Sequence, residues 1–230
     1  MTHLKTIAAP RSMKIHRNET IFTLTPSPGP HAKSECVTLG MLLREYLGLA
    51  ENRKEIKYIL NSKEVLVDGR RVKSENVPLG LMDILSIPEI EKDYIISVDH
   101  KGRLYPKEID KAHAGHKLCK LVGKTAVSGG KLQLNLYDGR NMLIDATDSK
   151  KYAVGGTLVI KLPEAKVLEF MPLEAGKTAM IAKGRHASKK GKILGISKSD
   201  LNLCSLTTVD CDGEKVVTNT EYVYIIGDKL

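Results

Sequence analysis

The chain has 230 residues, of which 36 are Lys or Arg and 27 are Asp or Glu, so its formal net charge is +9 at pH 7. The basic excess is spread along the whole length, which favours a polyanionic partner that contacts several modules. No segment approaches the roughly 18 consecutive apolar residues that a membrane-spanning helix needs. The N-terminus also lacks an apolar run of signal-peptide length, so we expect a cytoplasmic protein without a membrane partner.

The cysteines and histidines do not form a metal-binding pattern. Cys36, Cys119, Cys204 and Cys211 lie far apart without a C-x-x-C pair, so we expect small buried hydrophobes rather than a zinc site or a disulfide framework. His113 and His116 could share a helix face as metal ligands, but Gly115 between them favours a loop. We therefore predict no metal site and no cofactor.

Residues 1–36 are predicted to form an extended basic arm, because Pro26, Pro28 and Pro30 prevent regular structure. Such an arm cannot bury itself and would become ordered on binding RNA, the alternative being a solvated tail. Five basic residues are expected to bind phosphates along it: Arg11, Lys14, Arg17, His31 and Lys33.

The pattern changes to helical periodicity in residues 37–87. Leu39, Leu42, Leu43, Tyr46 and Leu47 form the apolar stripe of an amphipathic helix, which the next residue, a glycine, would end.

A second helix and a hairpin are predicted next along the chain. Asn52 can cap the helix together with Glu55. The alternating Val65-Leu66-Val67 then leads into Asp68-Gly69, a two-residue hairpin signal. Two short helices and a basic hairpin resemble the S4-like alpha-L RNA-binding module. The resemblance implies that these residues face RNA: Arg44, Arg53, Lys54, Lys57, Arg70, Arg71 and Lys73.

Residues 88–172 are predicted to be a central β domain that closes into a small barrel or sandwich. Short alternating stretches, such as 94–98 and 132–136, are separated by glycine-containing turns. Residues 119–122, 132–136 and 140–144 outline a three-stranded meander with its last turn at Asp138-Gly139. Arg140, beside this turn, is a further candidate for RNA contact.

Residues 173–230 contain a dense basic segment, 183–192, between two apolar stretches. This segment resembles a KOW motif, in which Gly184 and Gly191 would permit a tight turn between two strands of an SH3-like barrel. Many proteins with this motif have Gly where this chain has Ser188. The cations expected to approach phosphates are Lys183, Arg185, His186, Lys189, Lys190 and Lys192.

The order of arm, alpha-L module, central β domain and KOW barrel resembles the ribosomal protein S4e family across essentially the whole chain. The most specific matches are segments 3–5, 9–12, 26–31, 117–120 and 133–141. Met13 stands where that family often has Trp, and Tyr137 where it often has His. The compact length is more similar to archaeal members.

The resemblance implies an α+β, mostly β fold and a structural constituent of the small (30S) ribosomal subunit. Such a protein binds small-subunit ribosomal RNA and neighbouring small-subunit proteins, supports assembly and translation, and has no small-molecule substrate. Two alternatives share these features: an extra-ribosomal RNA-binding regulator, and an accessory subunit of an RNA-modifying enzyme.

We expect no enzyme activity. Alpha-L modules also occur fused to pseudouridine synthases, whose chemistry needs a buried Asp in a sizeable domain. Asp138 fits a turn better, Asp145 lies in a domain of only about 85 residues, and nucleotide-binding and hydrolase motifs are missing. Trp is absent and Phe occurs twice, so base stacking would fall mainly to the eight Tyr.

Overall fold

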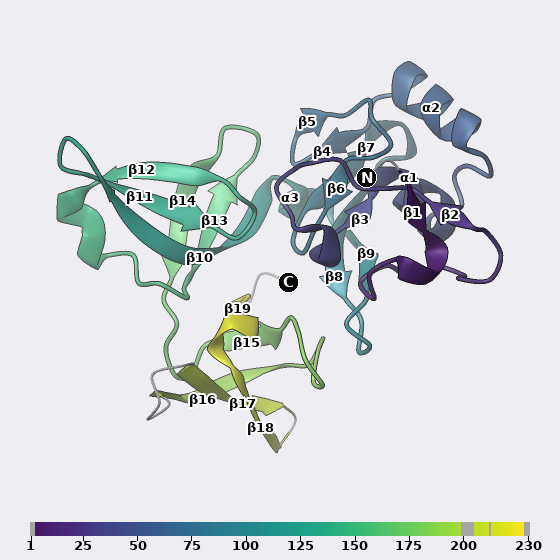
Figure 1. Ribbon diagram of the computed structural model, residues 1–230. Helices are drawn as coiled ribbons and strands as arrows, with labels where there is room; N and C mark the ends of the chain where they lie inside the picture. Colours follow the sequence, from purple (N-terminus) through teal and green to yellow (C-terminus); the bar gives the residue numbers. More distant parts are fainter. Residues whose placement is uncertain (1–2, 199–204, 212, 228–230) are drawn as a thin grey trace. The chain divides into compact units, whose positions relative to one another are not determined.

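The computed structural model describes residues 3–198, 205–211 and 213–227, which are mostly β with few helices (Figure 1). The chain divides into two compact units. Unit 1 comprises residues 1–99, 103–117 and 162–164, and unit 2 comprises 100–102, 118–161 and 165–230. None of the described helices is both long enough and apolar enough to span a bilayer.

Five antiparallel strands in the described part of unit 1 form one sheet in the order β5-β4-β7-β8-β9. Their bounds are β4 Leu66–Val67, β5 Arg70–Arg71, β7 Ile84–Ile87, β8 Lys92–Val98 and β9 Leu104–Ile109. Two short pairs accompany the sheet: β1 Leu4–Lys5 with β2 Phe22–Thr23, and β3 Val37–Thr38 with β6 Pro78–Leu79. The α-helices of this unit are α1 Leu39–Met41, α2 Arg53–Ser62 and α3 Lys111–Ala114.

The predicted helices are confirmed, although the first is irregular. The α1 helix is short and continues as a π-helical turn, Leu42–Tyr46, before Gly48 ends it with a φ of 62°. The α2 helix begins with the expected capping box, in which Glu55 accepts hydrogen bonds from the backbone amides of Glu51 and Asn52. Its apolar side buries Ile56 and Leu60.

The predicted hairpin at Asp68-Gly69 is confirmed. Both residues have positive φ, 51° and 72°, as a two-residue turn that matches the twist of its strands requires. Val67 pairs with Arg70 and Leu66 with Arg71, so the basic side chains lie on the strand that leaves the turn.

The expected domain boundary at 87/88 falls between two strands that pair. Ile87 of β7 is opposite Lys92 of β8, and the link between them is the 3₁₀ turn Pro88–Ile90 followed by Glu91 in the left-handed region. Strands β8 and β9 therefore belong to the sheet of unit 1 rather than to a separate central β domain.

The N-terminal segment is folded rather than an arm that cannot bury itself. Leu4, Met13 and Leu24 are buried, and the amide of Leu104 in β9 donates a hydrogen bond to the carbonyl of Ser12. Apolar anchors about ten residues apart hold the segment against the body of unit 1.

Unit 2 contains the predicted meander. In its described residues a five-stranded antiparallel sheet has the order β12-β11-β10-β13-β14. The bounds are β10 His116–Val127, β11 Lys131–Leu136, β12 Asn141–Asp145, β13 Thr157–Lys161 and β14 Lys166–Met171. One face packs into a core formed by Cys119, Leu121, Leu134, Leu136, Leu158 and Ile160, and Leu132 packs against it partly buried.

A second antiparallel sheet of unit 2 has the order β18-β17-β16-β15-β19. Its described strands are β15 Thr178–Ile181, β16 Lys190–Lys198, β17 Ser205–Cys211, β18 Glu214–Asn219 and β19 Val223–Ile225. Further 3₁₀ turns in the chain are Thr6–Ala8, Lys33–Glu35, Ala146–Lys150 and Thr220–Tyr222. Cys36, Cys119 and Cys211 are buried, whereas Cys204 lies outside the described residues.

The two glycines of the basic turn have different roles. Gly184 has a φ of 92° and permits the turn, as predicted. Gly191 does not have positive φ and lies inside β16, where a Cβ atom would come 2.1 Å from the carbonyl oxygen of Asp210. The expected turn role of Gly191 is therefore wrong, and close strand packing requires this glycine. The left-handed position near the end of the turn is Ser188, with a φ of 73°.

Replacing Gly191 with Ala should lower the free energy of unfolding by about 2 kcal/mol or more, because the Asp210 backbone cannot move away without breaking the β16–β17 ladder. Gly195→Ala is a matched control in the same strand, since a Cβ there meets nothing within 4 Å, and should change stability by less than about 1 kcal/mol. Urea denaturation measures both. Equal effects of the two substitutions would contradict the packing role.

Candidate nucleic-acid interface

A buried ionic cluster holds together the parts of unit 1 that carry the basic residues. The ammonium of Lys117 lies 2.6 Å from Asp68 Oδ2 and 2.6 Å from Asp83 Oδ1, with all three side chains almost fully buried. The Nε2 atom of His31 lies 2.8 Å from Asp83 Oδ2. The cluster therefore joins the N-terminal segment, the β4–β5 hairpin, the β6–β7 connection and the start of β10.

Backbone amides complete the cluster. The amide of Ile84 donates to Asp68 Oδ1 at 3.1 Å, and the amide of Gly80 donates to Asp83 Oδ2 at 2.9 Å. Gly80 allows His31 to reach this position, because a Cβ at residue 80 would lie 2.3 Å from the imidazole ring. His31 is thus a buried structural residue, and the expectation that it binds phosphate is wrong.

The two carboxyl groups of the cluster differ in their pKa. Burial raises the pKa of Asp68, and the negative charge of Asp83 raises it further against the opposing effect of Lys117. Burial would also raise the pKa of Asp83, but the charge of Lys117 and the hydrogen bonds from Lys117 and His31 lower it to about 2. Asp83 is therefore the more acidic of the two carboxyl groups.

In the N-terminal segment, only part of the predicted set faces solvent. Arg11, Lys14 and Lys33 are exposed. The guanidinium of Arg17 donates hydrogen bonds to the carbonyl oxygens of Thr6, Ile7, Ala9 and Pro10, at 2.9–3.2 Å. Arg17 therefore folds the segment instead of presenting a free charge.

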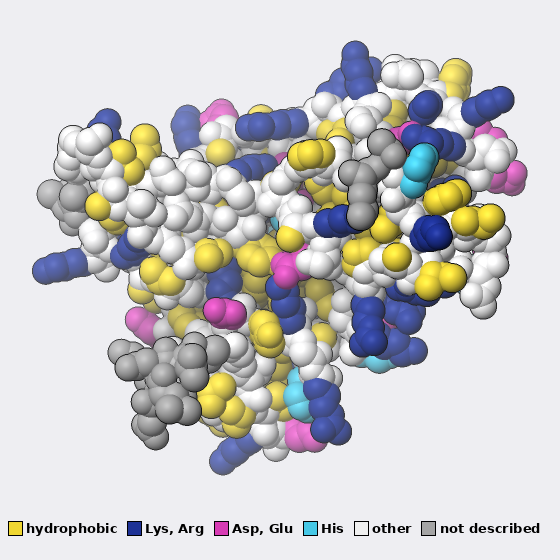
Figure 2. All heavy atoms as spheres, in the orientation of Figure 1, with side chains coloured by type: hydrophobic (Ala, Val, Ile, Leu, Met, Phe, Trp, Pro, Cys, Tyr) yellow, Lys and Arg dark blue, Asp and Glu magenta, His cyan; other side chains and the backbone are white. Residues whose placement is uncertain are grey.

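The α2 helix and the hairpin after it carry a basic surface. Arg53 pairs with Glu75 at 2.5 Å and Arg44 with Glu45 at 2.6 Å, so these two charges are partly neutralised. Lys54, Lys57 and Arg70 are exposed and make no ion pair within the part of the chain that the structure describes. Arg71 and Lys73 are also exposed, and Arg71 reaches the carbonyl of Asn61 at the end of α2. Figure 2 shows Lys and Arg side chains projecting from the region of α2.

The second predicted set lies in unit 2, around the turn from β15 to β16. Arg185, Lys190 and Lys192 are exposed and His186 is half-buried. Lys189 forms an ion pair of 2.5 Å with Glu214, and this bond lowers the pKa of the Glu214 carboxyl. The Lys183 ammonium stands 5.7 Å from the ring centroid of Tyr137, and Arg140 pairs with Asp138 at 3.2 Å.

Sequence reasoning missed the structural use of Lys120. Its buried ammonium donates hydrogen bonds to the carbonyl oxygens of Thr220, Glu221 and Val223, at 2.8–2.9 Å. Burial lowers the pKa of Lys120 to about 8; Glu221 opposes the shift and Lys183 adds to it. One signal was available, because Lys117 and Lys120 interrupt an apolar strand in which an unpaired cation could not be buried.

Exposed cations grouped on mostly β units are typical of proteins that bind nucleic acids. In residues 3–198, 205–211 and 213–227, no three His, Cys, Asp or Glu side chains are grouped as metal ligands would be.

Comparison with known proteins identifies the family. The model described as Ribosomal family S4e matches residues 90–167, and that of the RS4NT domain matches residues 2–34. The small ribosomal subunit protein eS4 of Methanococcus maripaludis is 38% identical over 230 residues, covering 98% of this chain and 93% of the relative. That of Methanosphaera stadtmanae is 40% identical, covering 98% and 92%.

A solved structure agrees with these relatives. The 30S ribosomal protein S4e from Thermoplasma acidophilum is similar with a TM-score of 0.73 and 29% identity, over 84% of this chain and 95% of that one. The chain belongs to the S4e family of small ribosomal subunit proteins. Its family is one of structural proteins and not of enzymes, as the sequence analysis predicted.

Replacing Lys117 with Met should lower the free energy of unfolding by roughly 3–5 kcal/mol, because two buried carboxylates lose their shared cation. Adding Asp68→Asn to this variant should recover part of the loss, since one uncompensated charge disappears. Lys107→Met, at an exposed position of β9, is the control. A loss below about 1 kcal/mol for Lys117→Met would show that the cluster does not hold unit 1 together.

The stability contributed by Lys120 should depend on pH. Its pKa is about 8 in the folded chain against an ordinary 10.5, so the unfolded chain binds more protons between these values. The free energy of unfolding of the wild type therefore gains a contribution from Lys120 as pH rises from about 8 to about 10.5. The Lys120→Met variant lacks this contribution, because methionine has no ionisable group. The difference in unfolding free energy between them should widen over this range. Thermal denaturation at several pH values measures this difference. If it stayed constant with pH, Lys120 would have the same pKa in the folded and the unfolded chain.

Proposed function

We propose that this protein binds the ribosomal RNA of the small subunit as a structural constituent, and that an S4-like module in unit 1 supplies the main contact surface. The support is the set of exposed cations Lys54, Lys57 and Arg70, which lack intramolecular ion pairs in the described chain. Cations that are not neutralised by carboxylates can bind phosphates and release condensed counterions.

We propose two further sets of phosphate contacts, one on the N-terminal segment of unit 1 and a separate one on the basic turn of unit 2. Arg11, Lys14 and Lys33 are exposed in the first, and Arg185, Lys190 and Lys192 in the second. We assign the turn to a KOW-type element of an SH3-like barrel because it links adjacent antiparallel strands, β15 and β16, through Gly184. The Lys183 side chain lies against Tyr137 and is less available than its neighbours.

The relatives are named as small ribosomal subunit proteins, so we propose the ribosome as the site of action and neighbouring subunit proteins as further partners. Sucrose-gradient sedimentation of a lysate tests this directly. The protein should migrate with small subunits after a high-salt wash. Migration with free RNA or with another complex would favour an extra-ribosomal regulator instead.

Changing Lys54, Lys57 and Arg70 together to Ala should weaken binding to small-subunit ribosomal RNA and reduce the slope of log K against log salt by about 2–3, roughly one unit for each lost phosphate contact. Filter binding at KCl concentrations from about 50 to about 300 mM measures the slope, because counterion release dominates the salt dependence in this range.

A control with the same charge change separates contact from net charge. Lys92, Lys111 and Lys151 are each paired with a carboxylate, and their replacement by Ala also lowers the net charge by three. This control should keep most of the slope. Equal slopes for the two triple variants would contradict a surface centred on α2 and the hairpin.

A further inference from the structure

The β1–β2 ribbon at the N-terminus has an inner and an outer face. Leu4 pairs with Thr23, and both point to the body of unit 1, where Leu4 is buried and the Thr23 hydroxyl contacts the sulfur of Met41. Lys5 pairs with Phe22, and both are exposed. Because side chains alternate along a strand, His3 shares the outer face with Lys5.

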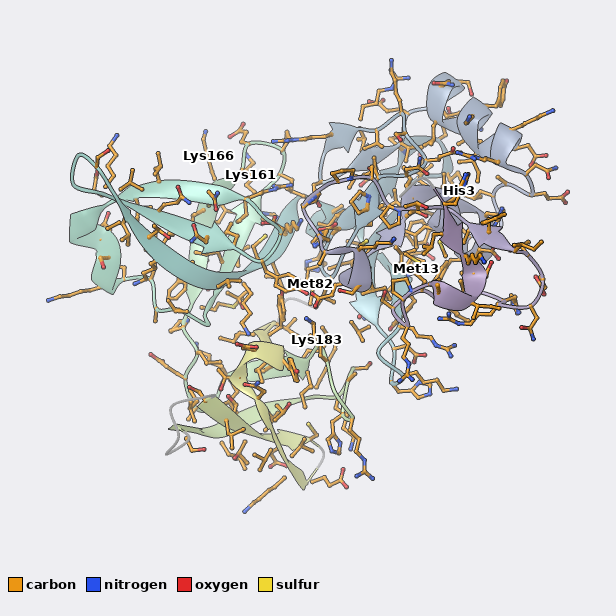
Figure 3. All side chains as sticks on the ribbon, viewed as in Figure 1. His3, Met13, Met82, Lys161, Lys166 and Lys183 are labelled. Atoms are coloured by element: carbon orange, nitrogen blue, oxygen red, sulfur yellow. The ribbon has the colours of Figure 1, made fainter. Side chains whose placement is uncertain are left out.

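An aromatic pair lies on this outer face. The imidazole of His3 and the ring of Phe22 have centroids 5.5 Å apart and an interplanar angle of 47°. Figure 3 labels His3 at the start of the ribbon. The chain has only two Phe; Phe170 packs against the core of unit 2, whereas Phe22 is 53% exposed. The aromatic ring of Phe22 is therefore not needed to fill an interior.

The N-terminal segment contains two further large apolar side chains that are exposed. Ile21 is 74% exposed and Ile7 is 80% exposed, although both belong to a segment that has its own buried anchors. Neighbouring apolar side chains that remain in water mark a surface for a partner more often than isolated ones do.

The ribbon is held in one conformation before any partner binds. The amide of Thr6 donates to the carbonyl of Ile21 at 3.0 Å, and the buried Thr6 hydroxyl donates to the carbonyl of Thr20. The four hydrogen bonds from Arg17 fix the chain that follows β1. A preorganised surface loses less conformational entropy on binding than a loose tail.

The net charge of the N-terminal segment, with Lys5 opposite Phe22 in the ribbon, favours a nucleic acid. In residues 3–36, Lys5, Arg11, Lys14, Arg17 and Lys33 outnumber Glu19 and Glu35, which gives a net charge of 5 − 2 = +3 without His. Glu19 lies 3.7 Å from His16. Flat rings beside cations match an unpaired nucleotide, whose base stacks on an aromatic face and whose phosphate binds a cation.

We infer that His3 and Phe22 form a stacking site for one unpaired nucleotide of the bound RNA, with Lys5 placed to contact its phosphate. This inference rests on the RNA binding proposed above and adds a base-contacting element to it. The stacking residue that we infer here is a phenylalanine and not one of the tyrosines.

The test compares substitutions of Phe22 that keep or remove the aromatic ring. Phe22→Leu retains an apolar side chain without a flat face, and should weaken binding to transcribed small-subunit ribosomal RNA by about tenfold or more. Phe22→Trp should bind as tightly as the wild type. Ile21→Ala removes an adjacent, more exposed apolar group and should change affinity by less than about twofold. Thermal denaturation of each variant reports whether the fold is intact.

The salt dependence distinguishes stacking from charge contacts. Stacking releases no counterions, so Phe22→Leu should leave the slope of log K against log salt unchanged while lowering K at every salt concentration. Crosslinking of the RNA to residue 22 by ultraviolet light should be lost in Phe22→Leu and retained in Phe22→Trp.

Other results would overturn the inference. The stacking site would be rejected if Phe22→Leu bound RNA with wild-type affinity. If the triple variant of Lys54, Lys57 and Arg70 still changed the salt slope, the proposed RNA binding would stand. Weakened subunit incorporation of Ile21→Ala and Phe22→Leu alike, without loss of RNA affinity, would mean that the ribbon binds a protein neighbour. A wild-type protein without salt-dependent RNA binding would refute the proposed function itself.

Discussion

The ammonium of Lys117, buried between Asp68 and Asp83, is the constraint on which unit 1 depends. A charge removed from water must keep its partners in place, because leaving any one of them uncompensated costs several kcal/mol. The partners come from segments that are far apart in sequence, and His31 adds the N-terminal segment through Asp83. The position of the basic hairpin therefore follows from interior electrostatics as well as from apolar packing. The strands β4 and β5 have only two residues each, so the hydrogen bonds between them contribute little to holding the hairpin in place.

The same physical requirement divides the basic residues into two groups. Arg17, Lys117 and Lys120 point inward or along the backbone and satisfy carbonyl or carboxylate oxygens. Lys54 and Lys57 stay in water. The net charge of +9 favours RNA as a partner, but the inward-pointing cations contribute to this charge without being exposed to phosphates. A basic residue inside an apolar run is better understood as part of the protein's interior than as part of its interface.

Local sequence signals predicted the elements that depend on neighbouring residues. The capping box of α2, the left-handed Asp68-Gly69 turn and the meander around Leu134 each depend on residues or strands that follow one another directly in the sequence. Local sequence signals failed to predict the position of a side chain where its hydrogen-bonding partner is distant in the sequence or is a backbone carbonyl. His31 is buried because of a carboxylate 52 residues away, and Arg17 binds carbonyls that no periodicity reveals. The pairing across Pro88–Ile90 was missed because a proline-containing segment is compatible with both a linker and a turn, and the left-handed Glu91 makes it a turn. The sequence predicted most of the exposed cations of the candidate site. It did not predict the pair of rings on the β1–β2 ribbon, because the exposure of these rings depends on which face of the ribbon is buried.

The two buried lysines also differ in when their partners are synthesised. Asp68, Asp83 and His31 all precede Lys117, so its ammonium can be neutralised as soon as that residue leaves the ribosome that makes it. The acceptors of Lys120 are the carbonyls of residues 220–223, a hundred residues later. Until those residues emerge, the ammonium of Lys120 lacks the acceptors that its burial requires and stays in water. During translation, the burial of Lys120 must therefore wait for residues 220–223, while the basic hairpin of unit 1 can already be held in place.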